Sequence, residues 1–310
     1  MAKNPVQFQK GLSLPDFLSR YGTEAQCREA LFQLRWPNGF VCPDCGNKTY
    51  CELSRRHLYQ CHRCHHQASV TAGTIFAHTK LPLTHWFLAI YRLTQDKKGI
   101  SAMELSRELG VKYDTAWNMK QKLMQTMAER DAGKRLDGRI EMDDAYLGGE
   151  LAGTPGRGSP NKTPFIAVVQ TTEDKKPQRI HLRMVPGFRK RAIARYAKES
   201  LTPDCVVWSD GLACFTAVKE AGCQHVPMVT GGGRKSAQSP AFKWVNTVLG
   251  NLKNSLRGTY HAISAKYADR YLAEFEYRFN RRFDLPAMVE RLAYVAVRTP
   301  PLPERILTMA

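Results

Sequence analysis

The chain has 310 residues, of which 43% are hydrophobic and 24% are charged, so it can bury a core and lacks the composition of a disordered chain. Its formal net charge of +18 favours a polyanionic partner such as nucleic acid, because each cation that neutralises a phosphate releases a counterion. No stretch approaches the roughly 18 apolar residues of a membrane span, and the start lacks the apolar run of a secretory signal. We therefore expect a cytoplasmic protein with no membrane association.

Helical periodicity marks the first part of the chain. Apolar residues recur at helical spacing over residues 15–38 and again over residues 80–96. A Pro-Asn-Gly sequence at 37–39 ends the first run, and residues 40–72 are rich in Cys and His. The first part therefore predicts two helical segments around a Cys-rich insert.

Four cysteines in this insert have the spacing of a metal site. Cys42, Cys45, Cys61 and Cys64 form the pattern C-x2-C-x15-C-x2-C, which lies in the range of zinc ribbons. Each C-x-x-C turn directs two thiolates at one ion, and four thiolates leave no open position, so we predict a structural Zn²⁺. The alternative of buried or redox cysteines requires two matched turns to occur by coincidence.

The other Cys and His residues near this motif have no clear metal role. Three histidines lie beside the second cysteine pair: His62, His65 and His66. One of them can replace a thiolate as a zinc ligand, although contact with solvent or phosphate is favoured. Five cysteines have no partner at metal spacing, and we expect them to be small buried residues: Cys27, Cys51, Cys205, Cys214 and Cys223.

Residues 99–128 have the pattern of two helices around a break at Gly110. This is typical of a helix-turn-helix, whose second helix enters the major groove of DNA, although any αα-hairpin has a similar pattern. The second helix would cover residues 114–127. With the turn before it, it would offer six polar side chains to DNA: Lys112, Tyr113, Thr115, Asn118, Lys120 and Lys122.

From residue 138 strands alternate with helices, which predicts an α/β domain with a helical C-terminus. Asp143 follows a predicted strand at 139–142, and Asp210 ends another at 205–209. Carboxylates at two strand ends can converge on a pair of Mg²⁺ or Mn²⁺ ions, the arrangement used for phosphodiester cleavage. The structural alternative is that each Asp only shapes a turn.

The chain resembles the insertion-sequence transposases of the DDE superfamily that carry an N-terminal zinc ribbon. The matching stretches are LRWPNGFVCPDCG, YQCHRCHHQASVTAGTIF, EMDDAYLGG, VVWSDG and GTYHAISAKYADRYLAEFEYRFNRRF. The resemblance implies a ribonuclease-H-like catalytic domain, with a mixed sheet flanked by helices, in which Asp143 and Asp210 are the first two metal ligands. It also implies a bacterial, nucleoid-associated protein that works as a homo-oligomer on double-stranded DNA, namely transposon ends and target.

The third catalytic position departs from the Glu of most members of that superfamily. Twelve residues before Gly258 of the GTYH motif stands Asn246, and Lys253 follows seven residues later, which resembles an Asp-Asp-Asn-Lys subgroup. Seven residues are about two helical turns, so both side chains share one helix face. Asn246 would offer a carbonyl oxygen to the metal and Lys253 would contact a phosphate; alternatively, Asn246 is only a helix N-cap.

Asp144 is a reserve carboxylate beside Asp143, although strand alternation directs it to the other face of the sheet. The expected domains are 1–80 (helix and zinc ribbon), 81–128 (helix-turn-helix) and 138–310 (catalytic). The expected activity is binding of terminal inverted repeats, metal-dependent cleavage and strand transfer by a 3′-OH. The alternatives are an inactive DNA-binding protein derived from a transposase, and a nuclease without strand transfer.

Overall fold

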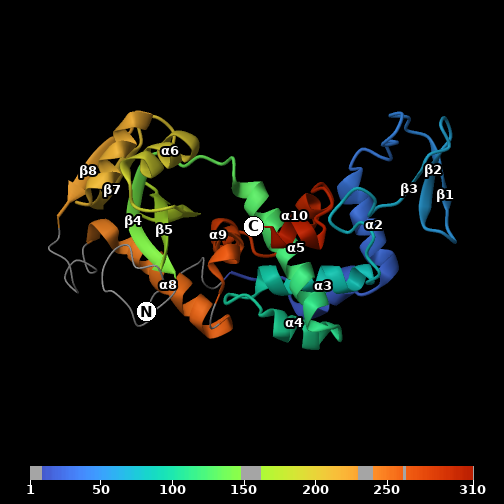
Figure 1. Ribbon diagram of the computed structural model, residues 1–310. Coiled ribbons are helices and arrows are strands. Elements are labelled where there is room, and N and C mark those ends of the chain that lie inside the picture. Colours follow the sequence, from blue (N-terminus) through green and yellow to red (C-terminus); the bar gives the residue numbers. More distant parts are fainter. Residues whose placement is uncertain (1–8, 148–161, 230–239, 261–262, 310) are drawn as a thin grey trace. The chain divides into compact units, whose positions relative to one another are not determined.

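The computed structural model describes residues 9–147, 162–229, 240–260 and 263–309 (Figure 1). The chain forms two compact units, one of Met1–Thr126 with Phe283–Ala310 and one of Met127–Arg282. Residues 283–310 thus belong to the first unit, whereas the sequence pattern placed them with the catalytic region. The reason is that the apolar face of α10 (Met288–Ala296) packs against α3 and α2 of the first unit.

The first unit is helical apart from a small sheet. Its elements are α1 (Leu14–Tyr21), α2 (Glu24–Arg35), β1 (Tyr50–Leu53), β2 (Leu58–Cys61), β3 (Gln67–Ala68), α3 (Leu83–Gln95), α4 (Ala102–Leu109), α5 (Tyr113–Asp131), α10 and α11 (Glu304–Thr308). The last residues of α5 belong to the second unit. Among the helices that the structure describes, none has the length and apolar character needed to span a bilayer.

The helical segment predicted over residues 15–38 is two helices. Thr23 begins α2 with a capping box, in which its side chain accepts from the backbone N–H of Gln26 and the Gln26 side chain accepts in return. This reciprocal pair satisfies the free N–H groups of a new helix start. The apolar spacing continues across the break at Gly22, which is why periodicity alone joined the two helices.

The small sheet has the antiparallel order β1-β2-β3 and carries the second pair of predicted zinc ligands. Aromatic rings pack between it and α2: the Phe32 ring centroid lies 5.1 Å from that of Trp36 and 4.8 Å from that of Tyr59. Rings of this size bury much apolar surface in a short segment. The ribbon is therefore held by this aromatic cluster as well as by its cysteines.

Helices α4 and α5 occupy the region that the sequence pattern predicts as a helix-turn-helix. Ser101 caps α4 through the backbone N–H of Glu104, and Gly110 ends it with a left-handed φ of 64°. Only a residue without a Cβ adopts this conformation freely, and it is the usual helix ending. The chain then turns within two residues into α5.

The second unit is built around a five-stranded mixed sheet. Its elements are β4 (Arg139–Leu147), β5 (Thr163–Thr171), β6 (Pro177–Met184), α6 (Lys190–Ser200), β7 (Val206–Asp210), η1 (Ala213–Ala221), β8 (Gln224–Met228), η2 (Pro240–Phe242), α8 (Lys243–Thr259), η3 (Ala265–Tyr267) and α9 (Ala268–Arg281). The strand order is β6-β5-β4-β7-β8, with β4 antiparallel to β5 and parallel to β7. This mixed sheet flanked by helices confirms the predicted ribonuclease-H-like fold.

Side-chain alternation along β4 divides the core into two layers. Ile140 and Met142 pack with α6 and η1 on one face, whereas Ala145 and Leu147 pack with α8 on the other. Figure 1 shows α6 and α8 on opposite sides of the sheet. Because strand side chains alternate, the odd-numbered residues of β4, Asp143 among them, face α8.

Candidate active site and zinc centre

Two aspartates lie side by side where the β4–β7 ladder ends. The last parallel pair is Met142 with Ser209, and Asp143 and Asp210 follow it directly. The prediction that Asp143 ends its strand is wrong, because β4 continues to Leu147 along β5. What ends at this point is the pairing with β7, and this brings the two carboxylates together.

Asp144 joins this pair, contrary to the expectation from strand alternation. Carboxylate oxygens of Asp143, Asp144 and Asp210 lie within 4.8 Å of one another. The backbone N–H of Asp144 donates to Asp143 Oδ1 at 2.9 Å, and that of Leu212 donates to Asp210 Oδ1 at 3.1 Å. Since the three residues lie at the open end of a ladder, side chains from both faces of β4 can converge there.

The three carboxylates repel one another electrostatically. Burial, and then the charges of Asp144 and Asp210, raise the pKa of Asp143 to about 7, while Lys253 acts in the opposite direction. A bound cation would relieve this repulsion, and hard divalent ions such as Mg²⁺ prefer carboxylate oxygens. The donor set therefore fits a divalent cation.

Asn246 and Lys253 both lie on α8, the helix that covers the Asp143 face of the sheet. Because α8 begins at Lys243 with Phe242 at its N-cap, the alternative that Asn246 is the N-cap is wrong. Lys253 is exposed and lowers the pKa of Asp143, which places its charge within electrostatic reach of the carboxylates. Asn246 is half-buried in the first turn of the helix.

Sequence reasoning missed Glu141, a buried acid two residues before Asp143. Its Oε2 accepts hydrogen bonds from the backbone N–H groups of Trp244 at 2.9 Å and Val245 at 3.0 Å. The available signal was the strand period, since Glu141 falls on the same face of β4 as Asp143. An acid at such a position must find partners if it is buried.

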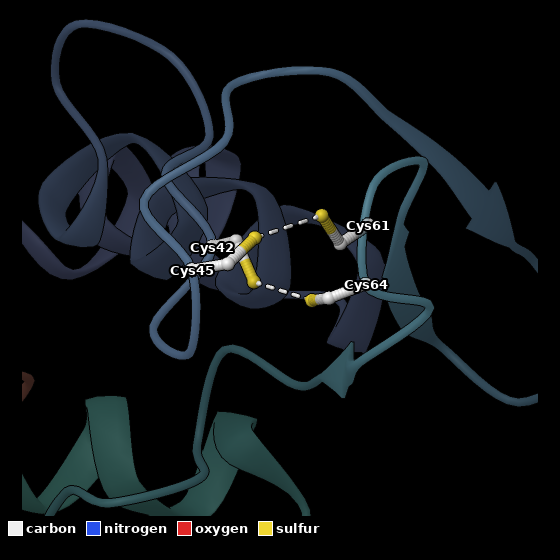
Figure 2. A group of neighbouring side chains, drawn as sticks. All are labelled: Cys42, Cys45, Cys61 and Cys64. Carbon is white, nitrogen blue, oxygen red and sulfur yellow. Dashed lines mark hydrogen bonds between the residues drawn. The ribbon is translucent and has the colours of Figure 1, made fainter.

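The four cysteines of the zinc ribbon are arranged for one metal ion. The Sγ atoms of Cys42 and Cys64 are 3.6 Å apart, as are those of Cys45 and Cys61, and all four lie within 4.8 Å of one another. A tetrahedral site with Zn–S bonds of about 2.3 Å has sulfur–sulfur edges of roughly 3.8 Å. Figure 2 shows the four sulfur atoms turned toward a common centre. This geometry supports a structural zinc ion.

Among the described residues, the neighbouring histidines lie outside this cluster of cysteines. His62, His65 and His66 are exposed, and the metal-type cluster consists of the four cysteines. The cysteines without a metal role are buried as predicted, except Cys51. Cys51 is exposed because its strand, β1, turns its two central side chains to solvent.

The predicted DNA-contacting side chains of the helix-turn-helix separate into two groups. Lys112 and Tyr113, at the start of α5, are exposed, and Thr115 is half-buried. Lys120 is 1% exposed, so the prediction that it contacts DNA is wrong. α5 is buried on more than one side, because Gln121 and Met124 are buried as well as the apolar residues at helical spacing, Ala116, Met119, Leu123 and Met127.

Asn118 and Lys122 are engaged within the first unit. The Asn118 amide donates to a Glu304 carboxylate oxygen at 3.3 Å. The Lys122 ammonium lies 6.0 Å from the centre of the Trp86 ring, and burial lowers its pKa. Their polar groups thus have contacts in the protein, which leaves the helix start as the accessible part of the predicted reader.

Comparison with known proteins finds two matching domains, one over each region that holds a candidate site. Residues 135–280 match the ISXO2-like transposase domain, and residues 22–67 match the transposase zinc-ribbon domain. A relative from Halobacterium salinarum, described as an uncharacterized protein in transposable element ISH50, is 27% identical over 219 residues, which is 66% of this chain and 72% of the relative. The two matched domains together span most of the described chain.

Similarity to solved structures is weak. The Mos1 strand transfer complex is 10% identical with a TM-score of 0.22, over 64% of this chain and 76% of that chain. The Mos1 transposase paired-end complex with left transposon end is 12% identical with a TM-score of 0.20, over 64% and 77%. The family assignment comes instead from the two matched domains, the zinc ribbon and the catalytic domain: the chain belongs to the ISXO2-like insertion-sequence transposases that carry a zinc-ribbon domain.

Proposed function

We propose that this transposase binds the terminal inverted repeats of its insertion sequence, cleaves the DNA backbone with Mg²⁺ or Mn²⁺, and joins the resulting 3′-OH to target DNA. The observation that carries the proposal is the carboxylate cluster at the end of the β4–β7 ladder, with the charge of Lys253 within reach. A basic chain with a net charge of +18 suits the phosphate backbone as substrate.

In this proposal Asp143 and Asp210 are the principal metal ligands, and Asp144 adds a third carboxylate. Asn246 contributes a neutral carbonyl oxygen from α8. Bound divalent cations would stabilise charge on the attacking and leaving oxygens of the phosphodiester. Lys253 holds a phosphate beside the reacting bond, because an ammonium donates hydrogen bonds and has no lone pair for a cation.

DNA recognition is assigned to the first unit. The exposed start of α5, with Lys112 and Tyr113, is where a helix-turn-helix meets base edges. The zinc ribbon adds exposed basic residues such as Arg63 on its second cysteine turn. Because two transposon ends must be brought together, we expect a homo-oligomer on DNA.

One experiment separates this function from its two rivals. The full chain is incubated with its own element ends, intact or pre-cut, and with Mg²⁺ or Mn²⁺, and both cleavage and joining are scored. Cleavage of intact ends together with joining of pre-cut ends supports the transposase. Cleavage without joining indicates a nuclease, and binding without either indicates an inactive DNA-binding descendant.

A further inference from the structure

The N-terminus of α8 is held by a side chain from another element. The first backbone N–H groups of a helix have no partner within the helix, and a Ser, Thr, Asp or Asn at the N-cap usually accepts from them. The N-cap of α8 is Phe242, which makes no such bond. The N–H groups of Trp244 and Val245 donate instead to one carboxylate oxygen of Glu141 on β4.

Glu141 is itself held firmly in place. Its side chain is buried, and its other oxygen, Oε1, accepts from Arg139 Nη1 at 2.9 Å. The same Arg139 nitrogen donates to Thr171 Oγ1 at 3.1 Å, and the guanidinium lies 5.2 Å from the centre of the Trp208 ring. Strands β5, β4 and β7 thus all contribute to the orientation of one carboxylate.

This anchor joins the two elements that bear the proposed catalytic groups. Glu141 lies two residues before Asp143, on the same face of β4. The last amide that it binds, that of Val245, directly precedes Asn246, and Lys253 is two turns further along the same helix. A displacement of the helix start would therefore move both side chains relative to the carboxylates.

We propose that Glu141 is a positioning residue of the active site, which fixes α8 so that Asn246 and Lys253 face the carboxylate cluster. The inference rests on the proposed function, because it assigns Asn246 and Lys253 to the metal and the phosphate. Glu141 itself has both oxygens engaged with Arg139 and the helix, so its part is to hold the helix and not to bind metal.

A matched control exists elsewhere in the same unit. Glu276 on α9 is also 1% exposed, accepts from the backbone N–H of Leu182 at 2.9 Å, and pairs with Arg183. It ties α9 to β6, the edge strand that β5 separates from β4. Removal of Glu141 takes a partner from Arg139 and from two backbone N–H groups, and removal of Glu276 takes a partner from Arg183 and from one backbone N–H group. The two costs in stability should therefore be of the same order.

The test compares full-length Glu141→Ala, Glu141→Gln and Glu276→Ala with the wild type. Three quantities are measured: Mn²⁺ affinity by titration calorimetry without DNA, hydrogen exchange of the backbone amides at residues 243–246, and cleavage of element-end DNA. Glu141→Ala should weaken Mn²⁺ binding about 10-fold, the lower end of the range for residues that orient metal ligands. It should also accelerate exchange at those amides and slow cleavage.

Glu141→Gln keeps an oxygen that can accept from both amides, so its exchange and Mn²⁺ affinity should remain close to those of the wild type. Glu276→Ala should leave both properties unchanged. The proposal is overturned if Glu141→Ala matches Glu276→Ala in Mn²⁺ affinity and exchange, or if a folded Glu141→Gln is as defective as Glu141→Ala. Mn²⁺ affinity and hydrogen exchange are measured without DNA cleavage. A wild type that binds Mn²⁺ but does not cut DNA would therefore contradict the proposed function and not the role of Glu141.

Discussion

Met142 of β4 pairs with Ser209 of β7, and this is the last pair of their parallel ladder. The residue that follows each of them is an aspartate, so the register alone sets Asp143 beside Asp210. Asp144 completes a group whose carboxylate oxygens lie within 4.8 Å of one another. The proposed active site is thus set by the position at which β4 and β7 stop pairing.

The zinc ribbon should hold about one zinc ion per chain, and Cys61→Ser should lose it, because a closed thiolate site needs all four ligands. Metal content of the purified protein measures this. Cys51→Ser is the matched control, since Cys51 is exposed and lies outside the cluster. Full zinc content in Cys61→Ser would contradict the site.

Asp143→Asn should stabilise the protein in the absence of divalent cations. The folded state raises the pKa of Asp143 from 3.8 to about 7, so it binds this proton more tightly than the unfolded chain does. The stabilisation of the folded state by this tighter proton binding is fully present below pH 3.8 and is lost as the pH rises through about 7. Near pH 8 the variant should therefore gain up to about 4 kcal/mol in unfolding free energy, since the pKa rises by about three units and one unit corresponds to about 1.4 kcal/mol.

Denaturant unfolding at pH 4 and pH 8, without Mg²⁺ and without chelator so that the ribbon keeps its zinc, checks this expectation. The difference between the wild type and Asp143→Asn should grow between the two pH values. Added Mg²⁺ should stabilise the wild type more than the variant. Identical pH dependence in the two proteins would show that the carboxylates do not repel one another as described.

Lys112→Ala should weaken binding to element ends and lower the salt slope of the binding constant by about one, as expected for one lost phosphate contact. Lys120→Met should leave DNA affinity unchanged, because the Lys120 side chain is 1% exposed. Binding titrations over a range of salt concentrations distinguish the two. Equal losses in both variants would mean that DNA contacts a surface other than the start of α5.

Lys253→Ala should slow cleavage without changing its dependence on metal concentration, whereas Asn246→Ala should change that dependence. The reason is that only the Asn side chain has a lone pair to offer a cation. Asn246→Glu should retain cleavage by supplying a carboxylate. Cleavage rates over a Mg²⁺ titration measure these effects, with the exposed Lys176→Ala as control; a normal profile in Asn246→Ala would remove Asn246 from the site.

The zinc site could be predicted in full because its determinants are local. Two C-x-x-C turns fix four sulfur atoms with little help from the rest of the fold. The mixed sheet also followed from the strand pattern together with the family resemblance. Asp143 was placed at a strand end because the sequence does not show which strands pair, and the pairing with β5 extends β4 to Leu147.

The remaining errors have tertiary causes. Lys120 is 1% exposed although it is not one of the apolar residues in the stripe of its helix, and periodicity alone does not show the burial of such a side chain. Residues 283–310 carry an apolar face that fits either unit by pattern, and only packing shows that it meets α3. The strand period places Glu141 on the same face as Asp143 but does not show its role, because its partners, the amides of Trp244 and Val245, are about a hundred residues away in the sequence.

The most direct test of the active site is metal-dependent strand cleavage at the element ends by Asp143→Asn and Asp210→Asn, each compared with the wild type. Asp204→Asn is the control, because Asp204 is exposed, precedes β7 and lies outside the carboxylate cluster. Both site variants should bind the ends with normal affinity and fail to cut them at any Mg²⁺ concentration, while the control cuts normally. Cleavage by Asp143→Asn at the rate of the wild type would contradict the site.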